Sequence, residues 1–347
     1  MSKMQYPATN RRPFIIPIFL PHSGCPHQCV FCNQRAITGT SRKNPSPSAI
    51  RSQIVEFLKY RGNLRNLVEI AFFGGNFLGL KMDYIKALLS EAATFVQAGQ
   101  ADGIRFCTRP DTIDYRRLEM IKPYPVSTIE LGVQSMDDHV LDLVMRGHTS
   151  ADTKVAVALL KQHNYRIGLQ MMVGLPGDSD ETAHATVVKI SNLQPDFVRI
   201  YPTVVLKNSL LAKWYQKGKY LPMSLESCVS LVKNLFLYFR AKNIPVIRMG
   251  LQASEDFDKG ATIMAGPYHP AFGHLVHSKI FLDMAISAID ARISTDDIVS
   301  INVHPRSLSK IKGLKNGNID FLKKRFKIRH LKIIPDSSMG EDKLSIE

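Results

Sequence analysis

The sequence predicts an α/β protein, a partial (β/α)6 TIM-like barrel followed by a small C-terminal α+β module. Two observations predict it. Apolar, β-branched runs alternate with longer helical patterns along the first two-thirds of the chain, the rhythm of parallel strands joined by crossover helices. Cysteine-, glycine- and polar-rich motifs follow these runs in turn, as expected where barrel strands end at the catalytic face.

Six strand–helix units account for the barrel, three-quarters of the eight-unit closed form. Strands are expected in the apolar runs at Phe14–Leu20, Leu67–Phe73, Ile104–Cys107, Thr128–Val133, Ile167–Val173 and Phe197–Tyr201. The intervening helices are expected near residues 48–61, 82–98, 113–121, 150–163 and 181–192. Ser46 or Ser48 and Ser179 stand where helix N-caps are expected.

A further helix near residues 224–242 ends at Asn243-Ile244-Pro245, where we place a domain boundary. Residues 10–245 then form the core domain, and residues 246–347 form a basic α+β module that is a candidate for substrate binding. The elements expected in this module are a strand at Val246–Leu251, a helix at Gly273–Ile289, a strand at Ile298–His304 and a last strand near Ile328–Ile334.

Composition limits the function classes. Hydrophobic residues make up 45% and charged residues 22% of the 347 residues, as in an ordinary globular protein rather than a disordered one. The apolar run at Phe14–Leu20 is interrupted by Pro17 and is too short to cross a bilayer, so no membrane association is expected. No signal-peptide pattern precedes it, and five cysteines without an export signal indicate a reducing, cytoplasmic setting.

The net charge of +15 is unevenly distributed. Residues 1–55 carry seven Lys or Arg and no acid, and residues 305–332 carry ten against Asp320 alone. Such concentration is what a polyanion-binding face needs, although basic runs are more often simply solvated surface. We therefore expect tRNA or another RNA as a partner, while noting that charge alone does not specify the target.

Three cysteines, Cys25, Cys29 and Cys32, lie within eight positions of the loop after the first expected strand. Closely spaced thiolates hold iron–sulfur clusters, and a cubane with four irons takes four ligands. This loop offers three, which leaves one iron open for an outside ligand. A zinc site or a disulfide are the alternatives. Zinc usually draws on a second Cys or His pair, none of which is evident, and three thiols leave one unpaired in any disulfide scheme.

Further motifs follow the second and third strands. The second strand runs into Gly74-Gly75-Asn76, and paired glycines at a strand end allow a backbone to approach a ligand closely. The third leads to Cys107-Thr108-Arg109-Pro110-Asp111, in which Thr108 and Arg109 would face a ligand, unless Arg109 pairs with Asp111.

Polar residues also interrupt the fourth and fifth strands. The fourth carries Glu130 and Gln134, with Arg146 twelve positions after Gln134. Burying these groups is costly unless they find partners, for which ribose hydroxyls and a ligand carboxylate are suitable. The fifth carries Gln170 and leads into a turn that contains Leu175.

Taken together, these motifs resemble those of the radical S-adenosylmethionine (SAM) superfamily, in which a CxxxCxxC loop follows the first barrel strand. The resemblance covers residues 12 to about 220 and is strongest to the Elongator catalytic-subunit lineage. The segments that carry it are Thr108-Arg109-Pro110-Asp111, Gly132-Val133-Gln134-Ser135 and Ile200-Tyr201-Pro202-Thr203. The acetyltransferase domain of that lineage is not expected here, because no Gly-rich loop of the acetyl-CoA type follows the barrel.

The resemblance implies a cofactor pair and its contacts. Cys25, Cys29 and Cys32 would hold a 4Fe–4S cluster whose open iron binds SAM, and an electron donor such as flavodoxin or ferredoxin would reduce it. The implied SAM contacts are Phe31, Gly74, Gly75, Asn76, Thr108, Glu130, Gln134, Arg146, Gln170 and Leu175. Asn76 and Gln170 depart from the related sequences, which carry Glu or Thr at the first position and an acid at the second.

The implied reaction is reductive cleavage of SAM and abstraction of hydrogen from a substrate by the resulting deoxyadenosyl radical. RNA is the leading substrate class. The alternatives are a porphyrin or another small organic molecule, as in oxygen-independent coproporphyrinogen oxidases, and a non-catalytic iron–sulfur or RNA-binding module. Tyr268 and His269, in the Gly/Pro-rich loop at residues 266–273, are candidates for a hydrogen donor or a substrate anchor.

Overall fold

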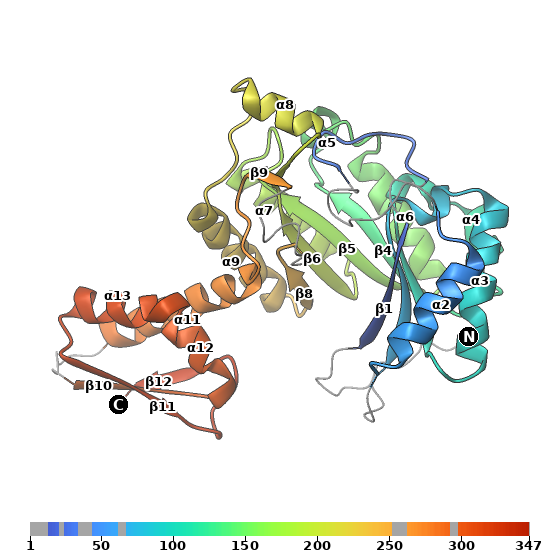
Figure 1. The fold of residues 1–347 in the computed structure, drawn as a ribbon. Coiled ribbons are helices and arrows are strands. Elements are labelled where there is room, and N and C mark those ends of the chain that lie inside the picture. Colours follow the sequence, from blue (N-terminus) through green and yellow to red (C-terminus); the bar gives the residue numbers. More distant parts are fainter. Residues whose placement is uncertain are drawn as a thin grey trace.

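The barrel is a curled sheet of seven parallel strands (Figure 1). The computed structural model describes residues 13–20, 24–33, 44–61, 67–251, 262–291 and 298–346, so part of the basic N-terminal segment lies outside the described residues. In spatial order the strands are β1 (Phe14–Leu20), β2 (Val68–Gly74), β3 (Gly103–Thr108), β4 (Val126–Gln134), β5 (Arg166–Val173), β6 (Phe197–Pro202) and β8 (Val246–Met249). All six expected barrel strands are confirmed.

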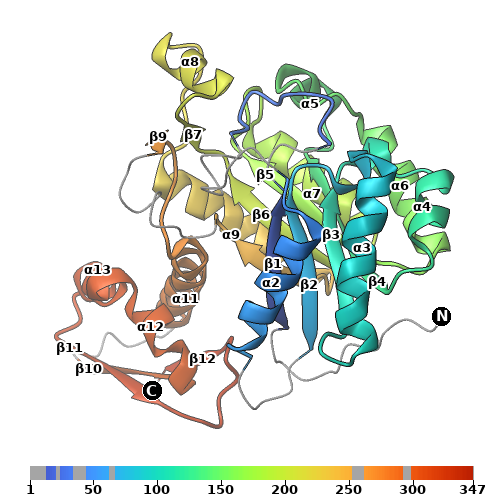
Figure 2. The same cartoon turned by 45° about the vertical axis from the view of Figure 1, so that its right-hand side comes forward.

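Helices cover the outer face of the sheet, as the two ribbon views show (Figures 1 and 2). They are α2 (Pro47–Leu58), α3 (Met82–Gln97), α4 (Tyr115–Ile121), α6 (Ser150–Gln162), α7 (Asp180–Asn192) and α9 (Leu225–Ala241). Of the two cap candidates for α2, Ser46 is the one whose hydroxyl accepts the Ala49 amide, and Ser179 begins α7 with a capping box.

The strand expected at Val246–Leu251 belongs to the barrel rather than to the C-terminal module. It is present as β8 and pairs with β6 as the seventh strand of the large sheet. A second segment beyond residue 245 also returns to the barrel, because β9 (Ile263–Ala265) pairs with β7 (Val205–Leu206). Neither pairing follows from the sequence pattern, and the division at residue 245 stays a prediction.

The C-terminal module has its own apolar core, separate from that of the barrel. Its sheet has the order β11 (His330–Pro335), β10 (Ile298–Val303) and β12 (Leu344–Ile346). Three helices accompany this sheet, α11 (Phe272–Asp290), α12 (Leu308–Lys312) and α13 (Gly317–Phe326). Helix α11 packs against α9 and so joins the module to the barrel.

The carboxyl ends of the barrel strands meet at one edge, which we call the mouth. Two short helices, α5 (Asp138–Leu143) and α8 (Leu210–Gln216), lie there, and the loop that follows β1 runs beside α5 in both ribbon views (Figures 1 and 2). Among the described residues, no helix combines the length and apolar character that a membrane span requires.

Candidate active site

The loop that carries Cys25, Cys29 and Cys32 is fixed at the mouth by backbone hydrogen bonds. The Val30 amide donates to the Val144 carbonyl at 3.1 Å, just after α5, and the Val30 carbonyl accepts the Leu211 amide at 2.8 Å, in α8. The Cys32 amide donates to the Cys29 carbonyl at 3.0 Å, which closes a tight turn between the second and third cysteines. None of the three cysteines forms a disulfide in this structure.

The donor set of this loop fits an iron–sulfur cluster in kind, because thiolates are the usual ligands of such clusters. Within the described residues, no three His, Cys, Asp or Glu side chains are grouped closely enough to hold a metal ion. The assignment of Cys25, Cys29 and Cys32 as cluster ligands therefore stays a prediction from the sequence.

A guanidinium group lies beside the buried Cys29 thiol. Arg146 donates from Nη1 to the Cys29 sulfur at 3.4 Å and from Nη2 to the Gly132 carbonyl at 2.6 Å. Arg146 is itself buried, and its Nε has no hydrogen-bond partner among the described residues. A buried donor left unpaired carries a desolvation cost that an anionic ligand would remove. Arg146 is thus suited to a carboxylate at this place.

The Cys25 thiol is also close to Arg146. Burial raises the pKa of Cys25, while the positive charges of Arg146 and Arg109 act to lower it. These two cations therefore lie within electrostatic range of the cysteine loop. A cation beside thiolates stabilises negative charge, as a bound iron–sulfur cluster requires.

Asn76 connects the cysteine loop to the neighbouring strand ends. Its side chain is buried, and Nδ2 donates to the Gly24 carbonyl at 2.9 Å, directly before Cys25. Its Oδ1 accepts the hydroxyls of Thr108 at 2.6 Å and Thr112 at 2.9 Å, and the Arg109 amide at 3.1 Å. Both ends of the amide are therefore engaged within the protein. Thr108, predicted as a SAM contact, is equally engaged.

The glycines beside the Asn76 hydrogen bonds leave no room for side chains. A Cβ on Gly24 would lie 2.2 Å from the Asn76 carbonyl oxygen, and one on Gly74 would lie 2.6 Å from the Leu20 carbonyl oxygen. Both residues also have positive φ, 74° and 120° respectively. The Gly75 amide donates to the Leu20 carbonyl at 3.0 Å. Glycine at 74 thus lets β2 end directly against the start of the cysteine loop.

Of the two alternatives for Arg109, the structure contains the ion pair. Its Nε and Nη2 donate to the two carboxylate oxygens of Asp111, each at 2.9 Å, and its Nη1 is buried without a partner among the described residues. His148 lies near two cations, Arg146 and Arg109. Burial, followed by the charges of Arg146 and Arg109, lowers the pKa of His148 to about 3, so its ring is neutral at physiological pH.

Gln134 occupies a strained position at the end of β4. Its φ of 67° lies in the left-handed region, at a bulge where the register between β4 and β5 shifts. A Cβ on Gly132 would lie 2.9 Å from Arg146 Nη2 and 3.0 Å from Gln134 Nε2, so both side chains gather over Gly132. Strain of this kind persists where surrounding structure enforces it, often at functional sites.

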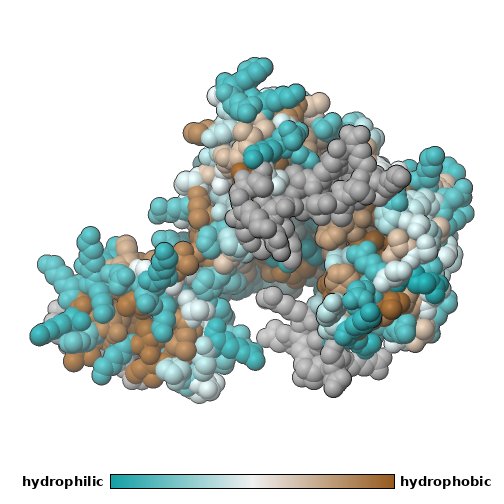
Figure 3. Space-filling model, viewed as in Figure 1, coloured by the Kyte–Doolittle hydropathy of each residue, from teal (hydrophilic) through white to brown (hydrophobic). Residues whose placement is uncertain are grey.

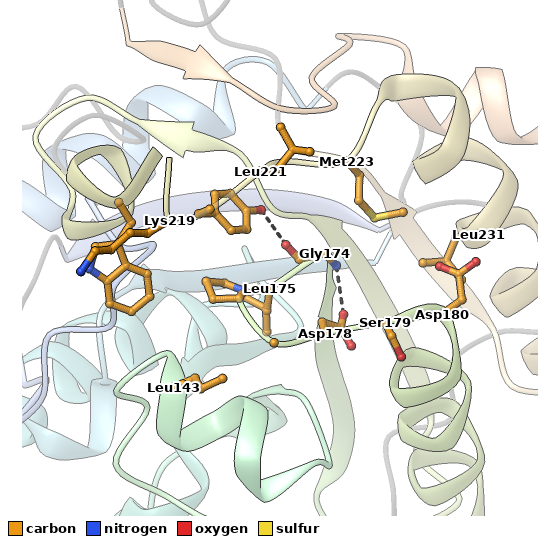
Figure 4. Close-up of a pocket in the computed structure, with 14 residues that line it drawn as sticks. Leu143, Gly174, Leu175, Asp178, Ser179, Asp180, Lys219, Leu221, Met223 and Leu231 are labelled. Carbon is orange, nitrogen blue, oxygen red and sulfur yellow. Dashed lines mark hydrogen bonds between the residues drawn. The ribbon is translucent and has the colours of Figure 1, made fainter. Parts of the chain in front are cut away.

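Phe31 and Leu175, both predicted as SAM contacts, pack into one apolar cluster at the mouth. The turn after β5 is fixed there by Tyr220, which donates to the Gly174 carbonyl at 2.6 Å, and by Asp178, which accepts the Gly174 amide at 3.0 Å. Figure 4 shows both bonds beside a cavity of about 460 Å³. Its lining includes Leu175 but none of the loop cysteines.

Glu130 is the centre of a buried ionic network rather than an open polar group. Its Oε1 accepts Arg105 at 2.5 Å, and its Oε2 lies 2.7 Å from Arg199 Nε and accepts Gln170 at 3.2 Å. Arg105 also donates to Glu69 at 2.8 Å. Burial by itself would raise the pKa of Glu130, but the two arginines hold it below its usual value. The expected partner was a ribose, and the partners found are protein side chains.

Three members of this network, Glu69, Arg105 and Arg199, were not identified from the sequence. Each stands alone among apolar residues of a different strand, β2, β3 or β6. The sequence did carry one signal that could have identified them. A charged residue stands in an otherwise apolar strand, and the neighbouring strand carries a residue of opposite charge. Gln170 remains half-buried and also donates to the Cys107 sulfur at 3.3 Å.

The two residues singled out near 268 lie close to this face. Tyr268 packs against Val204 and Leu206, in the segment that follows β6. The His269 ring nitrogen Nδ1 accepts the Ala271 amide at 3.0 Å, which stabilises the turn before α11. Neither contact indicates a chemical role.

Sequence comparison agrees with this geometry. Residues 19–190 match the model of the radical SAM superfamily, and residues 195–281 match that of the Radical_SAM C-terminal domain. The chain belongs to the radical SAM superfamily. Its members use a 4Fe–4S cluster and SAM, which are the cofactors of this radical SAM enzyme.

Among curated proteins, a tRNA uridine(34) acetyltransferase from Dehalococcoides mccartyi (strain CBDB1) is 28% identical over 243 residues, 61% of this chain and 53% of that protein. Elongator complex protein 3 of Saccharomyces cerevisiae is 27% identical over 201 residues, 52% of this chain and 36% of that protein. The radical SAM chain thus spans about half or less of the length of these relatives.

Among solved structures, the archaeal Methanocaldococcus infernus Elp3 with an N-terminal deletion superposes with a TM-score of 0.60 at 20% identity. The match covers 77% of this chain and 62% of that one. At this identity it shows the fold of the radical SAM enzyme and nothing about its substrate.

Proposed function

We propose that this radical SAM enzyme modifies RNA, with Cys25, Cys29 and Cys32 holding its cluster and SAM lying against the mouth of the barrel. The observation that carries the site is the Arg146 guanidinium, which contacts Cys29 and whose buried Nε has no hydrogen-bond partner among the described residues. When bound, the cluster and SAM supply a deoxyadenosyl radical that abstracts hydrogen from the substrate. The protein's task is to orient both partners and to exclude water.

The residues of the mouth divide this task. Arg146 provides positive charge for the carboxylate of SAM. Phe31 and Leu175, within one apolar cluster, provide the surface on which an adenine can pack away from water. Asn76 fixes the loop before Cys25, so its contribution is to position the cysteines rather than to touch SAM.

Gln134 and Gln170 are the remaining polar groups for the ribose. Both are half-buried, and Gln134 lies next to Arg146 over Gly132. Glu130 accepts a hydrogen bond from Gln170 and would therefore orient Gln170 toward the ribose rather than contact the ribose itself. A strand interior with this rigid ionic network keeps the strand ends in register.

RNA is favoured as substrate by the relatives that carry tRNA uridine(34) acetyltransferase activity in their names and by the net charge of +15. The test has two parts. Anaerobically reconstituted protein, supplied with dithionite and SAM, should form deoxyadenosine, and its absence would contradict the radical reaction. Mass spectrometry of nucleosides from cells with and without the gene should reveal a modification that disappears, and unchanged nucleosides would contradict RNA as substrate.

A further inference from the structure

The C-terminal module carries positive charge that the mouth of the barrel does not use. Six exposed side chains have no acidic partner among the described residues, and we call them the cationic surface: Lys312, Lys315, Lys324, Lys327, Arg329 and Lys332. Two of the neighbouring acids already have basic partners. Asp290 pairs with Arg325 at 3.8 Å, and Glu341 pairs with Arg306 at 2.8 Å. Residues 305–332 contain one acid, Asp320, so the positive charge of this surface is only partly compensated among the described residues.

The elements that carry these six residues adjoin one another in the module. Helix α12 packs against α13, and α13 in turn contacts β11, so the six residues come from adjoining elements. The face of this module in the space-filling view shows hydrophilic residues intermixed with hydrophobic ones (Figure 3). Like charges on adjoining elements repel one another, and a polyanion relieves that repulsion by replacing counterions.

An exposed aromatic residue accompanies these charges. Phe321, on α13, has 45% of its surface exposed and takes no part in the apolar core of the module. It lies one helical turn before Lys324, so the two side chains share a face. Aromatic rings beside cations are the usual surface for an unpaired nucleic-acid base, because the ring stacks while the cations bind phosphates.

We propose that the cationic surface binds RNA, with phosphates on its lysines and Arg329 and one unpaired base on Phe321. This proposal takes from the proposed function only that the substrate is an RNA. The module lies at the side of the barrel away from α5 and α8 at the mouth, as both ribbon views show (Figures 1 and 2). A small substrate cannot reach both places. An RNA can, so the module would hold a remote part of the same molecule that is modified at the mouth.

The test measures binding directly, with reconstituted full-length protein. Fluorescence anisotropy with bulk tRNA compares the triple variant Lys324→Ala/Lys327→Ala/Arg329→Ala with the matched triple Lys86→Ala/Arg116→Ala/Lys154→Ala. The matched residues are equally exposed, on α3, α4 and α6 over the barrel. We expect the first triple to weaken tRNA binding about ten-fold or more and to reduce the slope of log affinity against log salt by about two. Equal affinity of the two triples would overturn the proposal.

The base contact is tested separately with a labelled oligouridylate. Phe321→Ala should weaken binding about five-fold or more, and Phe321→Tyr should retain it, because a tyrosine ring still stacks. Equal oligouridylate binding by Phe321→Ala, Phe321→Tyr and the unaltered protein would overturn the role of Phe321. Binding of phosphatidylserine vesicles that depends on Lys324, Lys327 and Arg329, while tRNA binding does not, would also overturn the proposal.

The proposed function and the docking surface can fail independently. Deoxyadenosine formation without RNA should be the same in the first triple variant and in the unaltered protein, since the surface lies away from the mouth. If no protein forms deoxyadenosine but tRNA binding still depends on the cationic surface, the docking proposal stands and the radical reaction falls.

Discussion

The amide nitrogen of Asn76 donates a hydrogen bond to the carbonyl of Gly24, at 2.9 Å, and so ties the end of β2 to the residue before the first loop cysteine. Because Oδ1 of the same side chain accepts three donors from the end of β3, one buried amide joins three strand-end segments. The geometry of the cysteine loop therefore depends on a residue that is not a thiol.

Replacing Asn76 with alanine should weaken cluster assembly. The change removes the hydrogen-bond partner of the Gly24 carbonyl and of the Arg109 amide, and each buried unsatisfied group costs about 1–3 kcal/mol. We expect a lower melting temperature and less iron per chain after reconstitution. Asn192→Ala, at the exposed end of α7, is the control and should change neither. Full iron content in Asn76→Ala would show that the loop holds its shape without this bond.

The three loop cysteines should be distinguishable from the other two by iron content. Cys25→Ala, Cys29→Ala and Cys32→Ala should each lose most of the bound iron and the formation of deoxyadenosine. Cys107→Ala and Cys228→Ala should retain both. Burial raises the pKa of each of these two thiols to about 12, so they stay protonated and are poor metal ligands. Loss of iron in Cys107→Ala, with the fold intact, would require a different ligand set.

Local patterns predicted the barrel well, because its strands are short apolar runs separated by helices with ordinary caps. Each of the six expected strands overlaps an observed one, and the capping box at Ser179 is where the Ser-Asp pair indicates it. The order of the mouth residues follows from the same argument, since parallel strands end on one side.

Long-range pairing could not be predicted in the same way. The residues of β8 form a short strand after a proline, and nothing local distinguishes a barrel strand from a strand of the following module. Likewise, Glu130 is a polar residue in an apolar run, but its pairing with Arg105 and Arg199 rather than with a ligand depends on side chains from two other strands, β3 and β6. Such partners exist only once the sheet has formed.

Replacing Arg146 with methionine should reduce SAM affinity more than it reduces stability. The guanidinium is buried beside Cys29, and a charge-assisted bond to a carboxylate is typically worth about 1.5–3 kcal/mol, or roughly ten- to hundred-fold in affinity. Calorimetric titration of the reconstituted protein with SAM measures this. Arg116→Met, at an exposed position on α4, is the control and should bind SAM normally. Unchanged SAM affinity in Arg146→Met would remove the arginine from the SAM site.

Glu130→Gln should destabilise the barrel in a pH-dependent way. Removing one charge leaves Arg105 and Arg199 buried without their shared carboxylate, and breaking a buried ion pair costs about 3–5 kcal/mol. The pKa of Glu130 is lower in the folded protein than its usual value of 4.5. Its contribution is therefore fully present above pH 4.5 and is lost as the pH falls through the lowered folded value.

The unfolding free energies of the two proteins should accordingly differ most near neutral pH and converge in acid, which urea titrations at several pH values would measure. Glu226→Gln, at an exposed position on α9, controls for the loss of one negative charge and should match the unaltered protein at neutral pH. If Glu130→Gln unfolds at the same urea concentration as that control at every pH, the ionic network does not hold the strands together. Glu130 would then be free to serve a ligand, as its position on β4 first suggested.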